Sequence, residues 1–212
     1  MSNIPSDPIS LPDLREWFGD IDIYLFDQLL KGRLTPQMQV LDAGCGGGRN
    51  LVYFLRSGYS VYGVDQSREA VAYIRSLAYA LAPHLPADNF RAESVERMSF
   101  ADVTFDVVIS SAVLHFARDE DHWHGMMREM WRVLKQGGIF FARLASTIGI
   151  EGQVERLAGR RYHLPDGSER FLVDEQMLLA TAELLGSEMV EPLKTVVVQN
   201  MRSMSTWCLR KT

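Results

Sequence analysis

The stretch that decides the fold is Val40-Leu41-Asp42-Ala43-Gly44-Cys45-Gly46-Gly47-Gly48-Arg49-Asn50. It leads from a short apolar run through an acid into four glycines within five positions, and residues of helical spacing follow. This pattern predicts a buried strand, a tight turn of bare backbone and the start of a helix. Because a helix N-terminus presents unpaired N–H groups, the turn suits a ligand that carries a carboxylate or phosphate.

The composition indicates one globular domain. The chain has 212 residues, of which 47% are apolar and 23% charged, and its net charge is −5. A negative net charge argues against non-specific binding to nucleic acid or to an anionic membrane, which requires a basic face. We expect no signal peptide and no membrane span, since no apolar run approaches ~20 residues. Cys45 and Cys208 are too few for a disulfide framework, so we expect reduced thiols and a cytoplasmic location.

Strands and helices alternate along the middle of the chain. The predicted strands are 40–43, 60–65, 90–93, 105–110 and 139–144, and the helices between them include 50–56, 67–82 and a segment from Trp123 to Lys135. Such alternation implies crossover connections and a parallel sheet covered on both faces. Residues 193–199 and 204–209 predict an antiparallel hairpin at one edge. The expected fold is α/β: a Rossmann-like, doubly wound, mostly parallel seven-stranded sheet with an antiparallel C-terminal hairpin in a single domain.

Three segments lie outside this alternation. Residues 1–12 are expected to form a loose tail, and residues 14–34 a helix broken near Gly19 that packs on the domain and also serves as a lid. Residues 146–173 have little periodicity and are expected to be an irregular insert, with a helix over 174–185 after it. We therefore divide the chain into an N-terminal arm and lid helix, 1–36, and a main domain, 37–212.

The glycine turn excludes one of three common ligand classes and argues against a second. A P-loop would need Gly-Lys where Arg49 and Asn50 stand. A dinucleotide fingerprint needs a third glycine at position 49 for close packing of helix on strand. The third class has an acid two residues before the glycines, Asp-x-Gly-x-Gly, and Asp42 to Gly46 match it.

Five segments in order resemble the class I S-adenosylmethionine-dependent methyltransferases, over roughly residues 38–144. The glycine stretch is similar to the first motif of that family, and Tyr62-Gly63-Val64-Asp65-Gln66-Ser67 to the second. The family's segments around its fourth strand are similar to Met98-Ser99-Phe100 and to Phe105-Asp106-Val107-Val108. The motif before its fifth strand is similar to Arg132-Val133-Leu134-Lys135-Gln136-Gly137-Gly138. The resemblance implies that 37–212 is a methyltransferase domain that uses S-adenosylmethionine and releases S-adenosylhomocysteine.

The resemblance also assigns cofactor contacts to individual residues. It places Asp65 at the ribose, whose two hydroxyls can donate hydrogen bonds to a carboxylate at a strand end. The alternative is that Asp65 caps the following helix, although Ser67 is better placed for that role. The family's acid before the adenine contact is replaced by Ser94, and Glu93 could substitute from one residue away. The complete set of predicted cofactor-binding residues is Asp42, Gly44, Cys45, Gly46, Arg49, Asp65, Gln66, Ser94, Val95 and Ser110, with Arg49 either on the methionine carboxylate or in solvent.

The acceptor side is harder to read. His115, just beyond the fourth strand, is the candidate base or substrate contact; the alternative is a histidine that only packs against the cofactor. His122, His124, Asp119 and Asp121 cluster at a helix start without metal-ligand spacing, so we expect no metal. Arg156, Arg160 and Arg161 either hold an anionic acceptor or form a solvated face.

Two absences favour a small-molecule acceptor over nucleic acid. Nucleic-acid enzymes that methylate amino groups carry an Asp/Asn-Pro-Pro-aromatic motif after the fourth strand, where this chain has Ser110-Ser111-Ala112-Val113. The chain also lacks the Pro-Cys pair that supplies the nucleophile of the cytosine-C5 enzymes. Trp17, Phe18 and Tyr24 of the N-terminal helix and the insert 146–173 are expected to bound the acceptor. Two alternatives stay open: a non-catalytic S-adenosylmethionine-binding sensor or partner subunit, and an NAD- or nucleotide-dependent enzyme, against which Arg49 argues.

Overall fold

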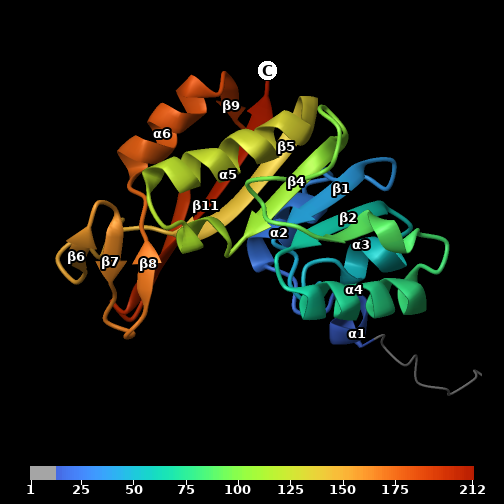
Figure 1. Ribbon diagram of the computed structural model, residues 1–212. Coiled ribbons are helices and arrows are strands. Elements are labelled where there is room, and N and C mark those ends of the chain that lie inside the picture. The colour runs from blue at the N-terminus through green and yellow to red at the C-terminus, as the bar shows by residue number, and fades with distance from the viewer. Residues whose placement is uncertain (1–12) are drawn as a thin grey trace, which may run out of the picture.

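A central sheet organises the protein, whose computed structural model describes residues 13–212 (Figure 1). The strands follow the order β10-β11-β5-β4-β1-β2-β3, and β9 pairs with β11. Their bounds are β1 Gln39–Ala43, β2 Ser60–Asp65, β3 Phe90–Ala92, β4 Phe105–Ser111, β5 Leu134–Ala145, β9 Ser187–Met189, β10 Lys194–Val198 and β11 Arg202–Lys211. The tail predicted for residues 1–12 lies outside the described residues.

Strands β1 to β5 run parallel, and β11 runs antiparallel to both β5 and β10. The predicted mostly parallel sheet and its C-terminal hairpin are therefore confirmed. The three-residue strand β9 makes the sheet eight-stranded and was not predicted. A segment this short has no alternation of its own, and it becomes a strand because β11 offers it backbone partners.

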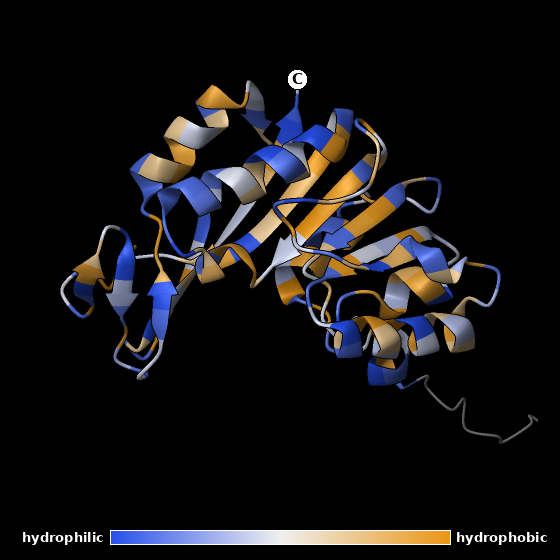
Figure 2. Ribbon diagram, in the orientation of Figure 1, coloured by the Kyte–Doolittle hydropathy of each residue, from blue (hydrophilic) through white to orange (hydrophobic). Residues whose placement is uncertain are grey.

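Helices cover both faces of the sheet, so successive strand residues enter different cores. Leu41, Val108 and Phe140 point toward α5 (Glu120–Val133) and α6 (Glu175–Leu184). Val40, Val107 and Phe141 point toward α2 (Ile23–Leu30), α3 (Val52–Arg56) and α4 (Arg68–Leu81). The strands are accordingly apolar along their length, as Figure 2 shows for the middle of the molecule, whereas the covering helices are mixed.

The segment 146–173 is not irregular as expected. It contains a three-stranded antiparallel sheet of β6 (Glu155–Ala158), β7 (Arg161–His163) and β8 (Glu169–Phe171). Its strands have three or four residues, and β6 is exposed throughout, so no apolar alternation marks it in the sequence. Buried Leu164 and Leu172 pack with Ala145 at the end of β5, and this small core holds the added sheet against the main one.

The N-terminal helical segment breaks at Gly19, as predicted. Helix α1 (Leu14–Phe18) ends there, at a φ of 62°, and α2 begins after Asp22. Phe18 stacks on Tyr53 of α3, with ring centroids 5.2 Å apart, so α1 packs on the domain.

Both ends of α2 are tied to the main domain. At its start the Asp22 N–H donates to Asn50 Oδ1 at 3.0 Å, and the Asp22 carboxylate pairs with Arg143 at 2.8 Å. At its end Lys31 and Arg33 pair with Glu191, which also pairs with Lys194, at 2.7 to 2.9 Å. A lid motion of this helix would have to break both sets of contacts.

We expect Glu191→Gln to lower the free energy of unfolding by about 2 kcal/mol, because it removes one charge that three cations share. Burial alone would raise the pKa of Glu191, but Lys31, Lys194 and Arg33 lower it to about 2. The stabilisation should therefore persist at neutral pH and disappear only as the pH falls from about 4.5 toward 2. Urea denaturation measures it, with exposed Glu183→Gln as the control. Equal stability of the two variants would contradict the role of this network.

Candidate functional site

The carboxyl end of β1 turns sharply at Gly44, where φ is 86°. A Cβ built there would lie 2.4 Å from Val113 Cγ2, so no side chain fits. The Gly44 and Cys45 N–H groups donate to the Val64 carbonyl at 2.8 and 2.9 Å. The glycine turn is thereby fixed to the end of the neighbouring strand β2.

Asp65, the last residue of β2, fixes this turn a second time. Its Oδ2 accepts from the Gly46 N–H, and its Oδ1 from the Ser67 N–H, both at 2.9 Å. Ser67 itself caps α4 by accepting from the Ala70 N–H at 3.2 Å. A carboxylate has about four lone-pair positions, so two acceptor positions of Asp65 are left for another partner.

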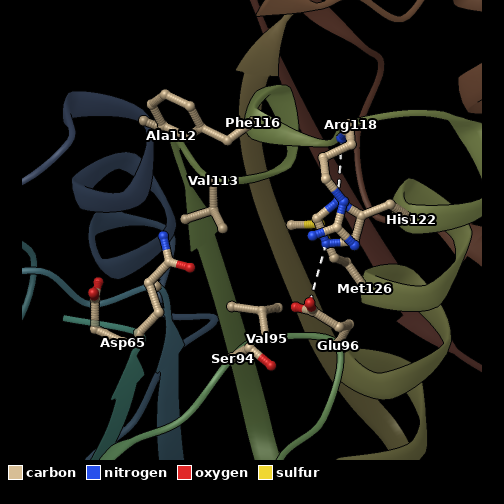
Figure 3. A pocket seen from close by; sticks show the side chains of 12 residues that line it. Asp65, Ser94, Val95, Glu96, Ala112, Val113, Phe116, Arg118, His122 and Met126 are labelled. Atoms are coloured by element: carbon tan, nitrogen blue, oxygen red, sulfur yellow. Dashed lines mark hydrogen bonds and ion pairs between the residues drawn. The ribbon is translucent and has the colours of Figure 1, made fainter. Parts of the chain in front are cut away.

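Asp65 opens onto a cavity of about 410 Å³ (Figure 3). Five of the predicted cofactor residues line it: Gly44, Asp65, Gln66, Ser94 and Val95. The sequence did not single out the other lining residues, Glu96, Ala112, Val113, Phe116, Arg118, His122 and Met126, as contacts of this cavity. In Figure 3 Asp65 lies at one side of the cavity and the Glu96–His122 group at the other, with Val95 and Val113 between them.

Glu96 brings a second acid to the cavity. Its Oε1 lies 3.3 Å from His122 Nε2, while His122 Nδ1 accepts from the Arg118 N–H at 3.1 Å. Burial raises the pKa of Glu96, but its own backbone N–H and the nearby His122 outweigh burial, so the pKa is lowered and the carboxyl stays ionised. Glu93, the substitute considered from the sequence, accepts instead from the Ser99 N–H at 2.8 Å and from the Ser99 hydroxyl.

One of the acids at the start of α5 caps that helix. Asp119 accepts from the His122 N–H at 2.8 Å, as an N-cap residue does. Within residues 13–212 no three His, Cys, Asp or Glu side chains gather closely enough to hold a metal ion.

Three predicted cofactor residues, Asp42, Cys45 and Ser110, are buried and do not line the cavity. Asp42 is only 1% exposed, and neither carboxylate oxygen has a hydrogen-bond partner within residues 13–212. Burial raises its pKa to about 7, although the charge of Arg49 and the nearby Asn50 side chain both lower it. An ionisable group left without a partner beside a glycine turn indicates a missing polar ligand.

A second cavity, of about 320 Å³, adjoins the first at Ala112, which lines both. Ala112 has a φ of 64°, a strained value for a residue with a side chain, and its N–H donates to the Arg143 carbonyl at 2.8 Å. The cavity is lined by Asp22, Arg49, Ser111, Ala112, His115, Arg143, Ala145, Leu164, Asp166, Ser168, Arg170, Val198, Arg202 and Met204. Leu164, Asp166, Ser168 and Arg170 bring the segment 146–173 to this cavity.

The N-terminal helices contribute to this cavity differently from the prediction. Asp22 lines it, and Tyr24 lies under the Arg143 guanidinium, 5.1 Å from ring centroid to Cζ. Trp17 and Phe18 do not line it. Arg49, predicted either to bind a carboxylate or to face solvent, is exposed and donates to the Ser111 hydroxyl at 2.9 Å.

His115 is buried at the second cavity, 7% exposed. Its Nδ1 accepts from the Ala145 N–H at 3.3 Å. Burial, with the charge of Arg170, lowers its pKa to about 4, so the ring is neutral at pH 7. Because Nδ1 is an acceptor, the single proton of the neutral ring is on Nε2, which makes the free nitrogen a donor rather than a base.

Comparison with known proteins agrees with this geometry. Residues 41–142 match the family model described as "Methyltransferase domain". A malonyl-[acyl-carrier protein] O-methyltransferase from Pectobacterium atrosepticum is 31% identical over 134 residues, which are 63% of this chain and 47% of that protein. Residues 41–142 therefore form a methyltransferase domain, and the motifs within them are similar to those of the class I S-adenosylmethionine-dependent type. The chain spans about half the length of the first curated relatives that it matches.

Solved structures of methyltransferases share the whole fold. One from Methanosarcina mazei, described as a SAM-dependent methyltransferase, has a TM-score of 0.70 and 20% identity, and the match covers 86% of this chain and 96% of that one. The 1,6-didemethyltoxoflavin-N1-methyltransferase of Burkholderia thailandensis was solved with bound 1,6-didemethyltoxoflavin and S-adenosylhomocysteine. It has a TM-score of 0.69 and 20% identity, and the match covers 92% of this chain and 80% of that one. None of the helices in residues 13–212 is long and apolar enough to cross a membrane.

We expect Asp42→Asn to change how the stability of the protein depends on pH. Because the folded-state pKa is raised from 3.8 to about 7, the folded protein binds more protons than the unfolded chain between these values, and stability falls as the pH rises. The variant should lack this fall and be more stable than wild type above pH 7, by at most about 4 kcal/mol.

Urea denaturation at several pH values tests this, with the exposed Asp121→Asn as control. A variant curve that runs parallel to that of wild type would mean that Asp42 is ionised at little cost in the folded protein.

Proposed function

We propose that the protein transfers a methyl group from S-adenosylmethionine to a small-molecule acceptor by in-line displacement. The observation that carries the proposal is Asp65. Two backbone N–H groups, those of Gly46 and Ser67, hold its carboxylate at the wall of the first cavity, with acceptor capacity left for a ribose diol. The second cavity, which adjoins the first at Ala112, is then the place for the acceptor.

The residues that line the first cavity offer contacts for the ribose and the adenine of the cofactor. Asp65 would accept from the ribose hydroxyls, with Gln66 beside it, and Ser94 and Val95 would contact the adenine. Glu96, the second acid of this wall, could accept from the adenine amino group in place of the acid that the family motif has near Ser94.

The amino-acid end of the cofactor would lie over Gly44 and Gly46, supported from beneath by Cys45 and Ser110. The Asp42 carboxylate, which has no hydrogen-bond partner within residues 13–212, suits the cofactor's ammonium group through a bridging water, because Asp42 does not line the cavity itself. Arg49, held at the junction of the two cavities by Ser111, would bind its carboxylate.

When bound, the cofactor supplies an electrophilic methyl group: a lone pair of the acceptor forms the new bond to carbon, and the carbon–sulfur bond breaks with its electrons left on sulfur. The protein's part is to align the acceptor and exclude water. The His115 Nε2–H would donate a hydrogen bond that orients the acceptor. The acceptor therefore arrives deprotonated or loses its proton to water.

The proposed setting is the cytoplasm, with no nucleic acid or membrane as partner. Cys45 and Cys208 are buried free thiols, which supports a reducing compartment.

Calorimetry with S-adenosylmethionine, S-adenosylhomocysteine and NAD tests the cofactor. We expect the first two to bind and NAD not to, and we expect Asp65→Ala to weaken S-adenosylhomocysteine binding tenfold or more, about the value of hydrogen bonds to a charged group. The matched control is Glu69→Ala, an exposed acid in the first turn of α4, the helix that follows Asp65. Unchanged affinity in Asp65→Ala would sink the cofactor assignment. Binding without turnover on thiol, hydroxyl, amine and metalloid acceptors would favour the sensor alternative.

The role of His115 has its own test. Because its pKa is lowered to about 4, its imidazole carbon-bound proton resonances should not move between about pH 5.5 and 9. An NMR titration assigned with His115→Gln measures this, and the exposed His84 gives a comparison signal. A midpoint near neutrality would return His115 to the candidates for a general base.

A further inference from the structure

Positive charge is concentrated at the second cavity. Four of its lining residues are arginines and only two are aspartates, in a chain whose net charge is −5. The arginines come from separate parts of the fold: Arg49 follows the glycine turn, Arg143 is on β5, Arg170 on β8 and Arg202 on β11. Side chains that converge from four elements on one concave surface differ from a run of charges along a solvated face.

Two of the four arginines are already bound to other side chains. Arg143 pairs with Asp22, whose side chain is 2% exposed and which also caps α2. Arg49 donates to the Ser111 hydroxyl at 2.9 Å. These two contacts fix four residues that line the acceptor cavity.

The other two arginines keep most of their donors available. Arg170 donates one N–H to the Glu169 carbonyl at 2.7 Å, and its guanidinium lies over Phe116, 5.0 Å from the ring centroid. The Arg202 side chain makes no hydrogen bond or ion pair within residues 13–212. Asp166 is near enough for both arginines to influence it, but its Oδ1 accepts from the Ser168 N–H and hydroxyl, and neither guanidinium lies within 4.0 Å of it.

The rest of the lining fits a molecule with an acidic end and an apolar body. Leu164, Val198 and Met204 form an apolar wall, and the His115 Nε2–H adds a donor. A planar guanidinium can donate two parallel hydrogen bonds to a carboxylate. Two guanidinium groups in one cavity favour an anionic ligand, because a neutral or cationic ligand would leave their positive charge unbalanced.

We propose that the methyl acceptor is a small carboxylic acid whose carboxylate is bound by Arg170 and Arg202. This rests on the proposed function, because it takes the second cavity as the acceptor cavity. It leaves Arg156, Arg160 and Arg161, the arginines considered from the sequence, without this role: they bind the Gly159 carbonyl, Asp174 and Glu169 respectively, and none lines the cavity.

The test compares acids with their amides on protein saturated with S-adenosylhomocysteine. Calorimetry is run with 4-hydroxybenzoate against 4-hydroxybenzamide, 3-mercaptopropionate against 3-mercaptopropionamide, and inorganic phosphate. We expect at least one acid to bind about tenfold more tightly than its amide, and Arg170→Gln and Arg202→Gln each to reduce that preference about tenfold while the amide affinity is unchanged. Neither substitution should alter the dissociation constant for S-adenosylhomocysteine.

Arg128→Gln, exposed on α5 and outside both cavities, is the matched control and should retain the preference. Equal binding of acid and amide in every pair, or a preference that survives both substitutions, overturns the proposal. So does arginine-dependent binding of phosphate when no carboxylate binds. Failure of S-adenosylhomocysteine to bind wild type would instead refute the proposed function. The acid–amide comparison is then repeated on the protein alone, so the two failures are read separately.

Discussion

The site depends on one carboxylate that joins two strand ends. Asp65 accepts from Gly46 on one side and from Ser67 on the other, so the turn after β1 and the turn after β2 are fixed to a common point. Parallel strands place their carboxyl ends at the same edge, which is why a residue at the end of β2 can reach the turn after β1. The same carboxylate keeps acceptor capacity toward the cavity, so the contact that organises the turn also preorganises the ligand wall.

Beside this well-connected acid is one that is poorly connected. Asp42 is as buried as a core residue but has no hydrogen-bond partner of its own within residues 13–212, and its pKa is raised to about 7 by burial. Ala112, at the boundary of the two cavities, holds an unfavourable positive φ of 64°. Both features cost stability, and both lie where a ligand is expected. Functional sites commonly contain such strained or unsatisfied groups, and the stability of the surrounding scaffold compensates for their cost.

The two cavities divide recognition between different parts of the chain. The first is lined by the ends of β1, β2 and β4, the loop after β3 and the segment that leads into α5, all within the matched residues 41–142. The second adds Asp22, which caps α2, and residues from the segment 146–173 and the C-terminal hairpin, all outside the matched residues. Chains that share the first set can therefore differ in the second, which explains how one fold supports many acceptors.

The sequence by itself determined the sheet, the glycine turn and the cofactor family. Apolar runs, glycine stops and the acid at Asp65 are local signals, and the strands β1 to β4 were predicted within one residue of their observed bounds because each carries its own pattern. Strand β5 begins at Leu134, five residues before its predicted start and within the segment predicted as the end of a helix. Only the tertiary structure decided that β6 to β9 are strands, since three or four mostly exposed residues become strands through partners elsewhere in the chain.

The tertiary structure alone also brought Glu96 to the first cavity and Arg143, Arg170 and Arg202 to the second. The same is true of His115, a candidate base in the sequence that becomes a donor once Ala145 occupies its Nδ1. Hydrogen-bond partners and cavities are made by residues far apart along the chain, and no local pattern encodes those distances.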